Sequence, residues 1–263
     1  MNVHEYGKEN KKVIVMLHPS AVRWDYFAYL VPLLENDYHL IIPAIPGYDE
    51  ENPQDDFTSV EKISDDLAQW LLSHGIQTVD LLYGCSMGGA ILIRMFAERK
   101  VDYRNVVCDG GIAPYELPWI ITRLIAVRDF VGISAGKMIG EKMIGLLGKA
   151  FSTDGYTEED MKYIVRVLRS MSSKTIWNTF LSCDNYSMPE SIPAFDGVFQ
   201  YWYGEKEKGN RKPDIHYVQK RLPYAEFIEM KGLGHASMAS LHPQETAERF
   251  RALLEEAPNK EKT

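Results

Sequence analysis

Residues 83–90 read Tyr-Gly-Cys-Ser-Met-Gly-Gly-Ala and place a serine, Ser86, between Gly84 and Gly88. The run before it, residues 79–83, is apolar and predicts a buried strand, and a helical pattern follows the serine. A tight turn from strand to helix needs small residues here, because side chains at Gly84 and Gly88 would collide. The stretch therefore predicts a sharp turn that presents the Ser86 hydroxyl at the end of a strand.

On both sides of this turn, apolar runs alternate with helical patterns, which is typical of a parallel sheet flanked by helices. Strands are predicted at residues 13–17, 39–43, 79–83, 105–108, 197–203 and 225–230, and helices at 24–34, 60–73, 87–99, 216–221 and 244–255. Thr58 is expected to cap the helix at 60–73, because Glu61 follows three residues later. The pattern thus predicts an α/β protein.

Residues 114–193 contain short helical patterns and no convincing strand. We therefore predict a core formed by residues 1–113 and 194–263, with residues 114–193 as a helical insertion. The tail at 258–263 is charged and is expected to fray.

The composition of the 263 residues is that of a globular protein, with 45% hydrophobic and 25% charged residues. A formal charge of -8 and the lack of a Lys/Arg cluster give no electrostatic reason to bind nucleic acid or an anionic membrane. Three scattered cysteines without a CxxC pattern predict neither a disulfide framework nor a metal site. Because no signal-like segment or long apolar run is present, we expect a cytoplasmic chain without stable membrane insertion.

The Gly-Cys-Ser-Met-Gly segment between a strand and a helix resembles that of the α/β-hydrolase superfamily, and the resemblance extends over most of the chain. It implies a mostly parallel central sheet of about seven or eight strands, flanked by helices and carrying a helical cap. Residues 114–193 resemble the helical lid of the family, which implies that their apolar residues shape an apolar pocket. These residues are Trp119, Ile120, Leu124, Met138, Met143, Leu146, Leu147, Phe151 and Met171. The resemblance also implies that Ser86 is a nucleophile. Cys85 beside it is expected to be a small buried hydrophobic residue.

A histidine that could activate this serine follows the last predicted strand. Residues 231–236 read Lys-Gly-Leu-Gly-His-Ala and look like the family's Gly-x-Gly-His segment, so the resemblance implies that His235 is the general base. His18 ends a strand and matches a structural histidine of the family. The histidines without such a motif, for which we expect surface or packing roles, are His4, His39, His74, His216 and His242.

The carboxylate that orients the base is expected after the preceding strand. Residues 203–207 read Tyr-Gly-Glu-Lys-Glu where the family carries Gly-x-x-Asp, which implies that Glu207 takes the place of the aspartate. The chain order of serine, acid and histidine agrees with that of hydrolases. Glu205 and Asp184 remain alternative acids, and Asp109 is expected to be a turn residue.

The oxyanion-binding loop of the family corresponds to residues 17–21, which read Leu-His-Pro-Ser-Ala with a proline in place of the usual glycine. Proline has no N–H, so we expect the backbone amides of Ser20 and Met87 to be the oxyanion donors, with help from the Ser20 hydroxyl.

These parts suffice for acyl transfer without a metal or organic cofactor. We therefore expect a serine hydrolase that cleaves a carboxylic ester of a small or medium apolar acyl group. The alternatives are a lyase, a C–C hydrolase, whose elbow also looks like Gly-x-Ser-Met-Gly-Gly, an acyltransferase, and a hydrolase-like binding protein. The sequence does not indicate the oligomeric state.

Overall fold

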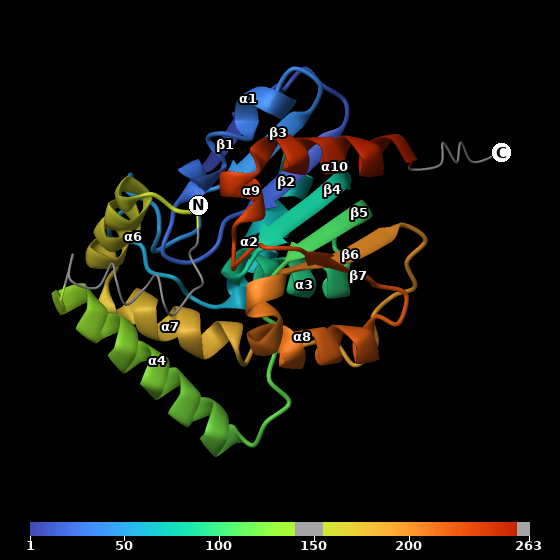
Figure 1. Cartoon of the computed structure of the whole chain (residues 1–263). Coiled ribbons are helices and arrows are strands. Elements are labelled where there is room, and N and C mark those ends of the chain that lie inside the picture. Colours follow the sequence, from blue (N-terminus) through green and yellow to red (C-terminus); the bar gives the residue numbers. More distant parts are fainter. Residues whose placement is uncertain (140–154, 257–263) are drawn as a thin grey trace.

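Seven strands form one sheet in residues 1–139 and 155–256, which are the residues that the computed structural model describes (Figure 1). The strands lie in the order β1-β3-β2-β4-β5-β6-β7. Their bounds are β1 (Val3–Tyr6), β2 (Val13–Leu17), β3 (His39–Pro43), β4 (Thr78–Cys85), β5 (Asp102–Asp109), β6 (Val198–Gly204) and β7 (Glu226–Met230). The predicted α/β class and the predicted number of strands are confirmed.

Strands β2 to β7 run parallel, and β4 lies between β2 and β5 in the sheet. The exception is β1, which pairs antiparallel with β3 so that Val3 faces Pro43. The sequence analysis did not predict β1. This strand forms an edge of the sheet and is only half-buried, and its charged and polar residues give no apolar run to detect.

Alternating side chains divide the core into two layers, one on each face of the sheet. In β2, Val13, Val15 and Leu17 join the layer beneath α2 (Val60–Ser73), α3 (Met87–Glu98) and α8 (Lys208–Arg221). Ile14 and Met16 join the layer beneath α1 (Val31–Leu34) and α10 (Pro243–Glu256). Figure 1 shows α3 and α8 on one side of the sheet and α1 and α10 on the other. The helices outside residues 114–193 are η1 (Trp24–Phe27), α1 (Val31–Leu34), α2 (Val60–Ser73), α3 (Met87–Glu98), η3 (Glu205–Glu207), α8 (Lys208–Arg221), α9 (Met238–Leu241) and α10 (Pro243–Glu256).

Three details of the predicted helices were wrong. The helix expected at 24–34 is broken into η1 and α1, because Pro32 fits only the first turn of a helix and α1 restarts there. The cap of α2 is Ser59, whose side chain accepts a hydrogen bond from Lys62 N, and not Thr58. The helix expected at 216–221 begins eight residues earlier at Lys208, despite a glycine and a proline that argue against it.

The described part of residues 114–193 contains α4 (Trp119–Ile139), α6 (Glu158–Ser170) and α7 (Ser173–Cys183), and no strand. Side chains of α7 bind the loop that precedes α2. Thr175 accepts a hydrogen bond from Phe57 N, and the Asn178 amide donates to the Phe57 carbonyl. These bonds tie α7 to the part of the chain that carries the sheet. The division of the chain into a core and a separate cap at residues 114–193 remains a prediction.

Helix α4 packs on α7 and leaves much of its apolar surface exposed. Trp119 and Met138 are 69% and 87% exposed, and Ile120 and Leu124 are exposed as well. The prediction that these four residues line a pocket is therefore wrong, because α4 buries its other face, where Phe130 meets Trp177. Met171 is buried in the core.

The remaining residues expected to line that pocket, Met143, Leu146, Leu147 and Phe151, lie outside the described residues, as does the tail at 258–263. Within the part of the chain that the structure describes, no helix combines the length and the apolar character needed to cross a membrane.

Candidate active site

Ser86 lies at the sharp turn between β4 and α3. Its backbone has φ 52° and ψ -113°, a positive φ that residues other than glycine rarely adopt. Such strain costs about 1–3 kcal/mol and persists only where the surroundings enforce it. Here Ser86 N donates to the Asp109 carbonyl at 2.9 Å, and the Ser86 carbonyl accepts from Ala90 N at 3.1 Å. The turn is held by β5 on one side and by its own helix on the other.

The two glycines that flank Ser86 are required by close packing. A Cβ atom at Gly88 would lie 2.3 Å from the Leu17 carbonyl oxygen, and one at Gly84 would lie 2.4 Å from the Gly88 carbonyl oxygen. Both distances are far below a normal contact between carbon and oxygen. The predicted steric reason for these glycines is therefore seen in the structure, and it links the turn to the end of β2.

A row of hydrogen bonds joins Ser86 to two of the predicted residues. Ser86 Oγ lies 2.9 Å from His235 Nε2, and His235 Nδ1 lies 2.6 Å from Glu207 Oε2. When Nδ1–H donates to the carboxylate, Nε2 is left as an acceptor for the serine hydroxyl. The structure thus brings together three side chains that are far apart in the sequence, in the arrangement that nucleophilic catalysis by serine requires.

Glu207 ends the short helix η3 and is the cap residue of α8, where the helix dipole favours negative charge. Its second oxygen, Oε1, accepts a hydrogen bond from Gly204 N at 3.1 Å. Burial acts to raise the pKa of Glu207, but His235, Arg211 and the Gly204 amide together outweigh it, and the pKa lies below its usual value. Glu207 is therefore ionised at neutral pH.

The two alternative acids occupy other positions. Glu205 is exposed and accepts a hydrogen bond from Gly232 N at 2.8 Å. Asp184 follows the last residue of α7, and burial raises its pKa to about 7. Among the contacts of the described residues, neither carboxylate reaches His235.

Asp109 differs from its predicted role as a turn residue. It is the last residue of β5 and is buried, and the Tyr83 hydroxyl donates to its carboxylate at 2.6 Å. Burial, together with the nearby charge of Glu207, raises the pKa of Asp109 to about 6. The sequence could not distinguish a strand end in the core from an exposed turn, because two glycines follow Asp109 and this combination is typical of turns.

The two expected oxyanion donors lie at different elements. Met87 is the first residue of α3, so its N–H belongs to the first turn and has no acceptor within the helix. Ser20 precedes Ala21, which has a φ of 64° and turns the chain sharply after β2. Their use as donors remains a prediction.

His18 is fully buried beside this loop. Its Nδ1 lies 2.8 Å from the Pro19 carbonyl, and Ile45 N lies 3.4 Å from its Nε2. Burial lowers the pKa of His18 to about 4, so the ring is neutral at pH 7. Both ring nitrogens are engaged with backbone groups, as expected of a structural histidine.

The other histidines for which contacts are seen have partners outside the site. His4 stacks on Trp24, His39 binds Glu5, and His74 stacks on Trp70. All three cysteines are buried and unpaired. In the described ranges, no group of three or more His, Cys, Asp or Glu side chains is arranged to hold a metal ion.

Two sets of neighbours were missed by the sequence analysis. Arg211 and Asp214 on α8 lie beside Glu207, and no motif marks them. The hydroxyls of Tyr26 and Tyr156 both donate to the Ala236 carbonyl at 2.6 Å. Ala236 follows His235 and has a φ of 56°, so these two bonds hold the loop that carries the histidine.

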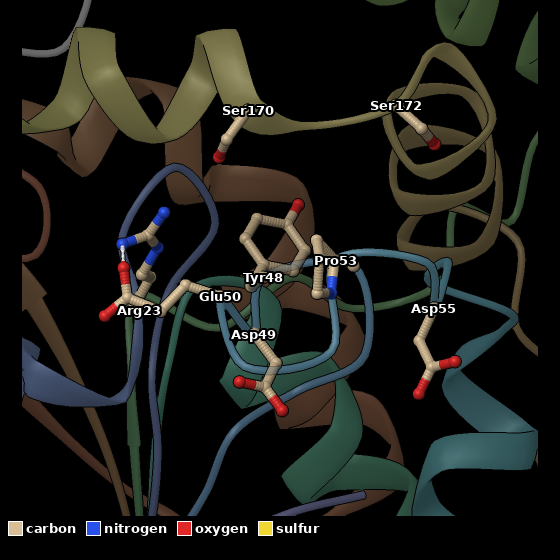
Figure 2. A pocket seen from close by; sticks show the side chains of 9 residues that line it. Arg23, Tyr48, Asp49, Glu50, Pro53, Asp55, Ser170 and Ser172 are labelled. Carbon is tan, nitrogen blue, oxygen red and sulfur yellow. Dashed lines mark hydrogen bonds and ion pairs between the residues drawn. The ribbon is translucent and has the colours of Figure 1, made fainter.

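A cavity of about 210 Å³ opens elsewhere, between the loop at 47–55 and the junction of α6 with α7. Figure 2 shows the ring of Tyr48 between the ion pair of Arg23 with Glu50 and the side chain of Pro53. Asp49, another wall residue, already accepts hydrogen bonds from Asn2 and Asn52. None of the predicted site residues lines this cavity.

Comparison with known proteins places the sequence in a family. The model of the alpha/beta hydrolase family matches residues 14–249, which is most of the chain. No protein of curated function matches the sequence.

Solved structures share the fold at low sequence identity. An alpha/beta hydrolase family protein from Desulfitobacterium hafniense is 18% identical, with a TM-score of 0.75 over 96% of this chain and 100% of that one. MenH from S. aureus is 16% identical, with a TM-score of 0.74 over 97% and 98%. A thermophilic esterase from Thermogutta terrifontis, with malate bound, is 17% identical, with a TM-score of 0.74 over 97% and 93%. These matches confirm the predicted α/β-hydrolase fold.

Proposed function

Because the chain belongs to the alpha/beta hydrolase family, we propose that it is a serine hydrolase that cleaves a carboxylic ester through an acyl-enzyme on Ser86. One observation carries this proposal: the row of hydrogen bonds from Ser86 Oγ through His235 to Glu207, with distances of 2.9 and 2.6 Å. Esterases among the proteins of similar fold support the same class of reaction.

In the first half of the proposed reaction, Ser86 Oγ attacks the ester carbonyl carbon while His235 Nε2 takes the hydroxyl proton. The tetrahedral intermediate collapses, the bond to the alcohol oxygen breaks, and His235 returns the proton to the departing alcohol. The products of this half are the free alcohol and an acyl group bonded to Ser86.

In the second half, a water molecule takes the place of the alcohol. His235 accepts a proton from the water as its oxygen attacks the acyl carbon, and then gives that proton to Ser86 Oγ as the carboxylic acid leaves. Glu207 stays ionised throughout and stabilises the imidazolium form of His235, and its lowered pKa supports this role.

The negative oxygen of both tetrahedral intermediates needs hydrogen-bond donors. We assign this role to the backbone N–H groups of Met87 and Ser20, because Met87 begins a helix whose first amides are available for a negative charge. The Ser20 hydroxyl is a further donor.

The acyl group in this proposal is small or medium and apolar. The residues bonded to Ser86 and to the His235 loop include Ile112, whose N–H donates to the Ser86 carbonyl, and Tyr26. Neither residue is charged at neutral pH, and this absence of charge at two positions next to Ser86 and to the His235 loop supports an apolar acyl group.

The test is the hydrolysis of p-nitrophenyl esters of increasing acyl length by the parent chain and by Ser86→Ala and His235→Ala. We expect turnover by the parent and a loss of about 10³- to 10⁶-fold in kcat for both variants. Ser73→Ala and His74→Ala at the exposed end of α2 are matched controls and should keep the parent rate.

An inert parent, or a Ser86→Ala variant with the parent rate, would contradict ester hydrolysis by Ser86. Labelling by a fluorophosphonate probe then separates the alternatives, because a binding protein with an inactive serine does not react. Acyl acceptors other than water, and substrates with cleavable C–C bonds, test for an acyltransferase, a C–C hydrolase or a lyase.

A further inference from the structure

A row of buried charges continues beyond Glu207 into α8. Arg211 Nε lies 3.5 Å from Glu207 Oε2, and Arg211 Nη1 lies 3.1 Å from Asp214 Oδ2. The side chains of Glu207, Arg211 and Asp214 are 5%, 16% and 1% exposed. Their spacing of four and then three residues places all three on one face of the helix and its cap.

Arg211 also contacts the strand end on the other side of the site. Its Nη1 donates to the Gly110 carbonyl at 3.3 Å. The Gly110 backbone packs directly against the bond between Glu207 and His235, since a Cβ atom there would lie 3.0 Å from Glu207 Oε1 and 3.1 Å from His235 Nδ1. Arg211 therefore links two parts of the site: the turn that carries Glu207 and the end of β5.

Asp214 holds this guanidinium in place. One of its oxygens pairs with Arg211, and the other accepts a hydrogen bond from Ala113 N at 2.8 Å. A buried guanidinium is costly without a partner, so the pair explains how Arg211 stays beside Glu207. The negative charge of Asp214 also limits how strongly Arg211 competes with His235 for the Glu207 carboxylate.

We propose that Arg211, held by Asp214, is a positioning residue that fixes the Glu207 carboxylate against His235 and balances its charge. The proposal rests on the proposed function, because it assigns Arg211 a role in activating Ser86. Arg211 does not touch the reacting atoms.

The charges of Arg211 and Asp214 affect the pH at which the His235–Glu207 pair loses its proton, and hence the pH dependence of Ser86 reactivity. Loss of the Arg211 charge makes deprotonation of the coupled His235–Glu207 pair harder, whereas loss of the Asp214 charge makes it easier. Among the described residues, the titratable groups that face the row from the packed elements are His235 after β7, Asp109 and Cys108 on β5, Cys85 on β4, Tyr201 on β6, Asp184 and Tyr186 after α7, and Tyr115 before α4. They are unchanged in both variants.

The experiment measures the rate of Ser86 labelling by a fluorophosphonate as a function of pH in Arg211→Met, Asp214→Asn and the double variant. The acid limb of this profile is the pH range over which the labelling rate falls as the solution is made more acidic. We expect its midpoint to move to a higher pH by about one unit in Arg211→Met and to a lower pH in Asp214→Asn. We also expect the limiting rate at high pH to fall about ten- to a hundredfold in Arg211→Met, because the carboxylate is no longer held. Arg211→Lys should restore the position of the limb.

The double variant keeps the test decisive if a single variant does not fold, since it leaves neither charge buried alone. Its acid limb should return close to that of the parent while its limiting rate stays low. Arg94→Met is the matched control, because it removes an ion pair with Glu98 of the same spacing on α3, from an arginine of similar exposure. It should label as the parent does.

Folded variants that label at the parent rate, with both acid limbs unmoved or moved in the same direction, would overturn the role of Arg211 and leave only a structural ion pair. Labelling requires an activated serine but no ester substrate. A parent that is not labelled would therefore overturn the proposed function together with this inference, whereas a labelled parent with unchanged variants would overturn this inference alone.

Discussion

The two ends of the hydrogen-bonded row are built in different ways. Ser86 is held by close backbone packing: Gly84 and Gly88 allow a turn that closes against β2, and Ser86 N donates to the Asp109 carbonyl at the end of β5. Glu207 is held by charges and one amide, which come from His235 after β7, from Arg211 one turn further along α8 and from Gly204 N. The comparison teaches that the nucleophile depends on the steric fit of backbone segments, whereas the acid depends on a balance of charges around its carboxylate.

Among substitutions that keep both Ser86 and His235, the largest effect is expected from breaking the acid end. Glu207→Gln removes the negative charge that stabilises the imidazolium and allows the wrong tautomer of His235, so kcat should fall by about 10³- to 10⁴-fold. Glu207→Asp keeps the charge but withdraws it by one methylene, and should lose only about ten- to a hundredfold. Steady-state kinetics on the best p-nitrophenyl ester measures both.

Glu205→Gln is the control for this pair, since Glu205 belongs to the same turn but binds Gly232 N. It should stay within a few-fold of the parent. If Glu205→Gln lost more activity than Glu207→Gln, the assignment of the acid would be wrong.

Breaking the nucleophile end sterically should have the next largest effect. Gly88→Ala places a Cβ atom 2.3 Å from the Leu17 carbonyl oxygen, which forces the turn away from β2. Since a misplacement of about 1 Å can cost a hundredfold in rate, we expect a fall of about that size in kcat, together with a lower Tm.

The same substitution at Gly132 on α4 is the control, because a Cβ atom there meets nothing within 4 Å. Gly132→Ala should leave kcat unchanged and stabilise the helix by roughly 0.5–1 kcal/mol. Steady-state kinetics and thermal unfolding measure kcat and Tm for both variants. If Gly132→Ala lost as much kcat as Gly88→Ala, close packing at the turn would not be the cause of the loss.

The smallest effect on activity is expected at Asp184, the buried carboxylate that lies outside the row. Its pKa in the folded state is about 7, raised from 3.8 by burial and by neighbouring carboxylates, so its contribution to stability is full below 3.8 and is lost as the pH rises through about 7. Asp184→Asn does not titrate. Between pH 4 and pH 8, the free energy of unfolding of the variant should therefore rise relative to that of the parent by up to about 4 kcal/mol, since each pKa unit is worth roughly 1.4 kcal/mol.

Urea unfolding at several pH values measures this gain, and the ester assay should show a rate within about twofold of the parent. A large loss of turnover in Asp184→Asn would instead make it a candidate acid. A difference in stability that does not change with pH would contradict the raised pKa.

The sequence predicts features that consecutive residues determine, and it does not predict contacts that form only when separate elements pack together. The turn at Ser86 and the parallel strands around it were predictable, because steric demand and apolar runs are written in consecutive residues. Arg211 and Asp214 were not, since their roles arise only when α8 packs against the end of β5. The apolar residues of α4 were misread for a related reason: composition does not tell which face of a helix is covered.

The carbonyl of Ala236 accepts hydrogen bonds from Tyr26, which precedes the insertion, and from Tyr156, which lies within residues 114–193. A chimaera that exchanges this segment for that of another enzyme, with the aim of a new substrate range, would also remove one of the two tyrosine hydroxyls that secure the loop of His235, and would leave Tyr26 and the longer bond from Ser240 at 3.2 Å. Substrate range and turnover are therefore not independent engineering targets in this chain, unless the grafted segment brings its own donor to that carbonyl.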